Sequence, residues 1–132
     1  MTSVELIEKA KKAAENAYVP YSDFYVGAAL LCGNGNVYTG CNIENSAYGP
    51  TNCAERTAFF KAISEGEREF EAIAIVGGKN LEFSNYCYPC GVCRQVMSEF
   101  CKGDFRIILG KSDGEITEMT LSDLLPHTFT LG

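Results

Sequence analysis

Two of the seven cysteines in this sequence form a pair with the spacing of a metal site. Cys90 and Cys93 are separated by two residues at the expected start of a helix. Residues three apart share one helix face, so both sulfurs can reach one ion, and this spacing is typical of zinc ligands. The positive end of the helix dipole favours the thiolate form that metals bind. Because two sulfurs cannot fill a zinc shell, we expect further ligands from elsewhere in the chain.

Cys53 and Glu55 lie at the start of the preceding expected helix and could complete such a site. Residues two apart diverge inside a helix, but they can face one site at its end, where the first residue is not yet helical. Glu55 offers a hard oxygen beside a soft sulfur, so it suits proton transfer better than ligation. Three sulfur ligands with one open position are the arrangement of a catalytic zinc site.

Cys87 leaves a second arrangement open, because Cys87 and Cys90 have the same spacing as the first pair. A set of Cys53, Cys87, Cys90 and Cys93 would make a closed, structural zinc site. Inert packing is a further interpretation, since free cysteine often behaves as a small core residue. A dithiol redox pair is disfavoured because Cys53 competes for the sulfurs. Spacing alone does not distinguish the open site from the closed one.

The elements that must position these residues follow from the hydrophobic pattern. A capping box of Thr2 and Glu5 begins a helix whose apolar face runs from Leu6 to Ala17. Helices are also predicted at 53–64, 90–100 and 121–125, and strands at 25–32, 37–40, 72–76, 105–109 and 115–119. Residues 41–52 and 77–88 are expected to be loops. Strands separated by helices favour an α/β fold with a mixed sheet and helices packed on its faces.

Composition limits the classes of function. The chain has 132 residues, a net charge of −6 and an apolar share of 46%, which predicts one compact domain. The acidic balance disfavours binding to nucleic acid or to an anionic membrane. No apolar run has the length of a membrane span, and the first residues lack the apolar core of a signal peptide. An odd number of cysteines argues against a disulfide framework, so we expect a cytoplasmic protein.

Several motifs in one order carry a resemblance to a known family. Cys53–Arg56 and Pro89–Gln95 resemble the signature of the zinc-dependent cytidine deaminases, in which His or Cys precedes the glutamate and a P-C-x-x-C segment follows. A first cysteine ligand is typical of the small homotetrameric type. Tyr18–Ala29, Gly40–Asn45 and Leu124–Pro126 also match, so the resemblance covers nearly the whole chain.

The resemblance implies a fold and an activity. The fold is a three-layer α/β/α sandwich around a five-stranded mixed sheet, with residues 1–132 as a single cytidine deaminase domain. One Zn²⁺ per subunit, held by Cys53, Cys90 and Cys93, binds a water and lowers its pKa. Glu55 moves protons from that water to the base and to the leaving ammonia. Cytidine and deoxycytidine thus become uridine and deoxyuridine, a reaction of pyrimidine salvage.

The resemblance also assigns residues around the metal. Asn42 and Glu44 would hold the ribose hydroxyls, and the charge of Glu44 would repel a 5′-phosphate, which favours free nucleosides. Arg56 would neutralise part of the thiolate charge, whereas Arg94 could be a surface charge. The remaining expected substrate contacts, two of them reaching into a neighbouring subunit of a homotetramer, are Phe24, Ala54, Tyr48 and Phe129.

Two alternatives to an ordinary cytidine deaminase stay open on the sequence. One is a deaminase of a modified cytosine nucleoside such as blasticidin S, against which the ribose-binding segment 42–45 argues. The other is a non-enzymatic module with a closed four-cysteine zinc site, which would lose its metal and unfold if Cys87 were replaced.

Overall fold

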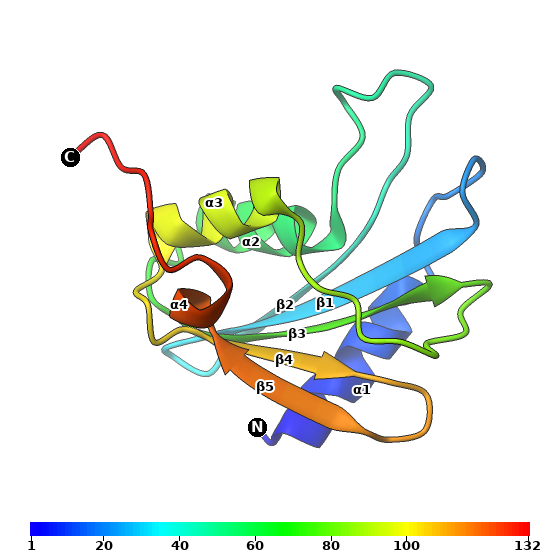
Figure 1. Cartoon of the computed structure of the whole chain (residues 1–132), viewed down its shortest axis with the longest axis horizontal. Helices are drawn as coiled ribbons and strands as arrows, with labels where there is room; N and C mark the ends of the chain where they lie inside the picture. Colours follow the sequence, from blue (N-terminus) through cyan, green and yellow to red (C-terminus); the bar gives the residue numbers. More distant parts are fainter.

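A five-stranded mixed sheet forms the centre of the molecule (Figure 1), as described by a computed structural model of residues 1–132. The strand order is β2-β1-β3-β4-β5. Only β3 and β4 pair in parallel, and the other neighbours are antiparallel. The strand bounds are β1 Phe24–Cys32, β2 Val37–Cys41, β3 Phe70–Lys79, β4 Arg106–Gly110 and β5 Ile116–Thr120.

Helices cover both faces of this sheet. Helix α1 (Ser3–Ala14) packs on one face, while α2 (Ala54–Ser64) and α3 (Gly91–Phe100) lie on the other (Figure 1). A short α4 (Leu121–Leu124) follows β5. These layers confirm the expected α/β/α sandwich. None of the helices has the length and apolar character needed to cross a membrane.

The continuous apolar run of β1 is explained by burial on both sides. Successive side chains of a strand point to opposite faces, and here Ala28 and Leu30 join the core under α2 and α3. Ala29 and Leu31 join the core under α1. A strand buried on both faces has no polar alternation, so the hydrophobic run in the sequence is the signature of a central strand.

A close approach at Gly40 sets the start of α2 against the sheet. A Cβ at this position of β2 would lie 2.5 Å from the carbonyl oxygen of Ala54, so only glycine allows the helix to come this near. Ala54 itself is fully buried. The first turn of α2, which carries three of the predicted site residues, is therefore fixed by backbone packing.

The structure corrects several expected boundaries. Strand β3 extends beyond 72–76 to Phe70–Lys79, because Gly77 and Gly78 pair with Val26 and Tyr25 of β1 although glycine is a poor strand former. The first helix ends at Ala14, so Ala17 lies outside it. The capping box at its start is present as predicted.

Candidate metal centre

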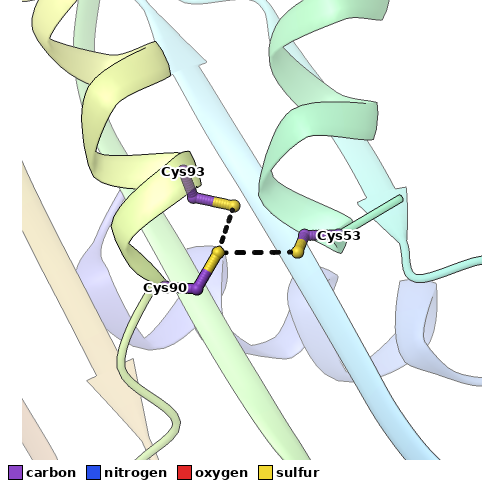
Figure 2. A group of neighbouring side chains, drawn as sticks. All are labelled: Cys53, Cys90 and Cys93. Atoms are coloured by element: carbon purple, nitrogen blue, oxygen red, sulfur yellow. Dashed lines mark hydrogen bonds between the residues drawn. The ribbon is translucent and has the colours of Figure 1, made fainter. Parts of the chain in front are cut away.

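Three of the predicted ligands come together at the adjoining ends of two helices. Cys53 is the N-cap of α2, Cys90 is the N-cap of α3, and Cys93 lies in the first turn of α3. The Cys53 and Cys90 sulfurs are 3.8 Å apart and those of Cys90 and Cys93 are 3.5 Å apart (Figure 2). All three ligand atoms lie within 4.8 Å of one another. Sequence segments almost forty residues apart thus supply one compact group of thiols.

The N-cap positions of Cys53 and Cys90 leave their sulfurs available. N-cap side chains ordinarily accept a hydrogen bond from the first helical turn, but neither cysteine makes such a bond. Both residues have extended backbone conformations that bring the side chain to the helix end. The positive ends of two helix dipoles therefore act on the same thiols, which favours their ionised form.

The donor set fits zinc. Four tetrahedral ligands at about 2.3 Å from the ion place neighbouring sulfurs about 3.8 Å apart, close to the two observed separations. Thiolates are soft ligands of the kind that zinc accepts. Because the group contains three side chains, a fourth ligand position is left for a small molecule, as in catalytic zinc sites.

Arg56 supplies positive charge to this group. Its Nη2 donates to the Cys53 sulfur over 3.2 Å. Hydrogen bonds from the neighbouring Cys93 thiol and from Arg56 lower the pKa of Cys53 below its ordinary value. The Nε of Arg56 is buried without a hydrogen-bond partner in the chain. A half-buried guanidinium is thus directed at the sulfurs rather than at solvent.

Glu55 is the one charged side chain buried in the fold, with 4% of its surface exposed. Burial raises the pKa of this carboxyl to about 7. No other side chain hydrogen-bonds to it, and its own backbone N–H is the donor that partly offsets the rise. A carboxyl whose pKa lies near neutrality can both take up and release a proton, which is the requirement for general acid–base chemistry.

Cys87 does not join the thiol group. Its side chain packs over Gly77 of β3, where an added Cβ would come within 2.6 Å of the Cys87 sulfur. Burial raises the pKa of this thiol to about 12. The closed four-cysteine arrangement left open by the spacing is therefore not the one that the chain adopts.

Asn42 and Glu44, the predicted sugar contacts, are already partly engaged within the chain. The Asn42 side chain accepts from the Val26 N–H and donates to the Phe24 carbonyl, both over 2.9 Å. Glu44 accepts from the backbone N–H groups of residues 21 and 22. Each side chain keeps hydrogen-bonding capacity beyond these contacts, so both are held in place without being saturated.

The predicted aromatic contacts are exposed to different degrees. Phe24 is 41% exposed at the start of β1, Tyr48 is 95% exposed in the loop between β2 and α2, and Phe129 is 66% exposed near the C-terminus. Within one chain neither Tyr48 nor Phe129 is buried against other side chains. Their assignment to a binding site remains a prediction.

Arg94 has a role that the sequence did not reveal. Its Nε donates to the Pro89 carbonyl over 2.8 Å, and its Nη1 donates to the Leu124 carbonyl over 2.9 Å. The guanidinium therefore ties the segment before Cys90 to the end of α4, rather than serving as a surface charge. The position of Arg94 directly after Cys93 was the signal in the sequence that this residue lies near the metal centre. Its two carbonyl partners could not be identified from spacing.

Comparison with known proteins decides the family. Residues 1–109 match the family model described as the cytidine and deoxycytidylate deaminase zinc-binding region. The chain belongs to this family. Its metal is zinc, and the three thiols are the group that fits it.

Individual relatives agree over nearly the whole length of the chain. The cytidine deaminase of Sporosarcina psychrophila is 56% identical over 96% of this chain and 90% of its own. That of Halalkalibacterium halodurans is 55% identical over 95% of this chain and 92% of its own. The crystal structure of the cytidine deaminase from Burkholderia pseudomallei superposes with a TM-score of 0.90 at 50% identity, covering 98% of this chain and all of that one. The three-layer fold is therefore that of a cytidine deaminase.

Proposed function

We propose that this family member hydrolyses the amino group of cytidine and deoxycytidine, which gives uridine or deoxyuridine and ammonia. The observation that carries the proposal is the buried Glu55 beside the three thiols at the meeting helix ends. Relatives at 56% and 55% identity that are named cytidine deaminase support it. Residues 1–132 act in this proposal as one catalytic domain.

The chemistry divides between the metal and Glu55. Zinc held by Cys53, Cys90 and Cys93 supplies a Lewis acid that lowers the pKa of a water at the open position. Glu55 takes a proton from the attacking water and delivers it to ring N3 of the cytosine. The oxygen of that water bonds to the ring carbon that carries the amino group. The same carboxyl then moves the second proton of the water to the amino nitrogen, which leaves as ammonia when its C–N bond breaks. A pKa of about 7 suits both steps, because the carboxyl can accept a proton and release it again at neutral pH.

Arg56 is proposed to keep the metal acidic. Three thiolates on Zn²⁺ leave a formal charge of −1, which would weaken its pull on a fourth ligand. The Arg56 guanidinium, 3.2 Å from the Cys53 sulfur, withdraws part of that charge through a charge-assisted hydrogen bond. The Nε of the same side chain is buried without a hydrogen-bond partner, and no carboxylate pairs with the guanidinium, which supports this role.

The substrate is proposed to be a nucleoside rather than a nucleotide. Asn42 and Glu44 would accept the sugar hydroxyls, with Phe24 and Ala54 beside the sugar and base. Hydrogen bonding by Ser22 holds the pKa of Glu44 below its ordinary value of 4.5, so this side chain is ionised at neutral pH. A negative charge near the sugar opposes a 5′-phosphate. Deoxycytidylate, named in the family's description, is therefore expected to react poorly.

We also infer a homotetramer in the cytoplasm. The high exposure of Tyr48 and Phe129 supports contacts with a neighbouring subunit, in which these side chains complete that subunit's site. Seven free cysteines support a reducing compartment. Size-exclusion chromatography with light scattering tests the assembly: a monomeric active enzyme contradicts it.

The activity is tested by loading the protein with zinc and following the loss of the cytosine absorbance with cytidine, deoxycytidine and deoxycytidylate in parallel. Ammonia release gives an independent readout. Glu55→Gln is the matched control, because it keeps the size of the side chain and removes the carboxyl. We expect turnover of both nucleosides by the unmodified chain alone. Absence of turnover by the zinc-loaded chain contradicts the proposal.

A further inference from the structure

Ser22 connects two residues that the proposed function assigns to substrate. The Ser22 hydroxyl donates to Oε2 of Glu44. The oxygen of this hydroxyl accepts from the backbone N–H of Phe24 over 3.0 Å. The hydroxyl carries a single proton, and an ionised carboxylate can only accept. The direction of the Ser22–Glu44 bond is therefore fixed.

The other carboxylate oxygen of Glu44 is occupied by the backbone. Oε1 accepts from the N–H groups of Tyr21 and Ser22, over 3.0 and 3.2 Å. A carboxylate has about four lone-pair sites, two on each oxygen. Three of these sites are filled from the segment of residues 21 and 22, so a single acceptor site remains, on Oε2.

That remaining site belongs to a side chain that lines a cavity. The cavity has a volume of about 380 Å³, and its walls come from the segment around Ser22 and from the loop between β2 and α2. Tyr21 and Ser46 join these two walls through a 2.6 Å hydrogen bond between their hydroxyls. The Ser22–Glu44 bond also links these two walls, so the carboxylate of Glu44 borders the cavity.

We propose that Ser22 is a positioning residue for substrate recognition, whose hydroxyl orients Glu44 so that one acceptor site is presented to a sugar hydroxyl. This inference rests on the proposed function, because it takes the ligand to be a nucleoside. Rotation of an unrestrained glutamate side chain would disperse that acceptor site over several orientations. The two backbone N–H groups hold Oε1, and the Ser22 hydroxyl adds the bond that fixes Oε2 before the substrate arrives. Pre-organisation of this kind increases affinity.

The role of Ser22 predicts a loss that depends on the substrate. Ser22→Ala removes two hydrogen bonds, the one to Glu44 and the one from the Phe24 N–H. Only the loss of the bond to Glu44 should weaken the binding of sugar hydroxyls. We therefore expect kcat/KM for cytidine to fall about tenfold, which corresponds to one hydrogen bond to a charged group. With 2′,3′-dideoxycytidine, which lacks the ring hydroxyls, the fall should be less than about twofold.

The experiment compares wild type, Ser22→Ala and Ser22→Thr on both substrates, with zinc-loaded protein. Ser22→Thr keeps the hydroxyl and should retain the wild-type ratio of the two substrates. Ser64→Ala is the matched control, because the Ser64 hydroxyl binds only the Lys61 carbonyl at the far end of α2. Ser22 lies at an exposed position, so thermal unfolding midpoints should be close in all four proteins.

The outcomes separate the two levels of the proposal. If wild type fails to deaminate cytidine, the proposed function is wrong. If wild type is active but Ser22→Ala loses equally with both substrates, or loses nothing, the positioning role is overturned. A Thr variant that behaves like the Ala variant also overturns it. Support requires that the loss fall on KM for cytidine, since a ground-state contact raises KM while kcat stays near its wild-type value.

Discussion

A glutamate lies near each end of α2, and the two environments shift the carboxyl pKa in opposite directions. At the first turn, Glu55 is buried without a hydrogen bond from another side chain, and its pKa is raised to about 7 by that burial. Just beyond the last turn, Glu67 accepts from the Asn34 and Asn36 amides and from the Tyr38 hydroxyl, over 2.9 to 3.2 Å. These donors lower the pKa of Glu67.

The contrast shows how to separate a structural carboxylate from a reactive one. Glu67 stabilises the hairpin of β1 and β2, because its carboxylate accepts from three side chains of that hairpin. Glu55 is desolvated but not paired, an arrangement that costs stability and therefore calls for a function. Perturbed carboxyls without structural partners are candidates for proton transfer.

The largest loss is expected from removing the sulfur of Cys93, which lies in the first turn of α3 and faces the start of α2. Cys93→Ser replaces a thiolate by a hydroxyl that zinc binds poorly, so we expect zinc content and activity to fall to background. Metal analysis and the cytidine assay measure both. Cys87→Ser is the matched control, because Cys87 lies outside the thiol group; it should keep zinc and activity. Loss of zinc from the control would restore the four-cysteine interpretation.

Glu55→Gln should separate activity from stability most clearly. An amide cannot shuttle protons, so kcat is expected to fall by about 10³. The amide carries no charge to desolvate, so the thermal midpoint should stay equal or rise. Zinc content should be unchanged, which metal analysis checks. A variant that retains most of its turnover, or that unfolds more easily, would place Glu55 with the structural carboxylates.

Arg56→Gln is expected to have an intermediate effect. Groups that hydrogen-bond to metal ligands typically change activity or affinity by about 10- to 100-fold. We expect turnover to fall within that range while zinc content falls less, because three sulfurs still hold the ion. The measurement is kcat alongside zinc stoichiometry in the same preparation. Unchanged turnover would show that the bond to Cys53 does not influence the reaction.

The local patterns of the sequence predicted a mixed sheet with helices on its faces and a metal-binding pair at Cys90 and Cys93. The family resemblance, rather than spacing, selected the three-layer sandwich and the set of Cys53, Cys90 and Cys93. The apolar run of β1 and the spacing of Cys90 and Cys93 are properties of neighbouring residues. The ends of β3 were missed because Gly77 and Gly78 are strand residues only through their pairing with β1. Helix-end geometry, in contrast, was anticipated for Cys53.

Contacts between distant segments could not be predicted in the same way. The side chain of Arg94 reaches the Leu124 carbonyl, thirty residues away, and Ser22 reaches Glu44 across a loop. Such partners depend on three-dimensional proximity, and an arginine or a serine in a sequence carries no mark of its acceptor. The exclusion of Cys87 from the thiol group likewise follows from packing on Gly77, which spacing does not encode.

The smallest effect on activity is expected from Glu67→Gln. This substitution should lower the thermal stability of the protein instead. The amide group offers fewer acceptor sites to Asn34, Asn36 and Tyr38, so the thermal midpoint should drop by a few degrees at pH 7 while kcat/KM for cytidine is unchanged. Because the pKa of Glu67 is lowered from its ordinary 4.5, its contribution is fully present above that value. The contribution is lost as the pH falls through the lower folded pKa.

The midpoint of wild type should therefore approach that of Glu67→Gln at pH 3, whereas the two differ at pH 7. Thermal unfolding followed by circular dichroism at both pH values measures the difference. If the midpoint difference persists at pH 3, neutral hydrogen bonds rather than the ionised carboxylate hold the turn. If the variant loses turnover at pH 7 without unfolding, the two ends of α2 are coupled and the division between a reactive and a structural glutamate fails.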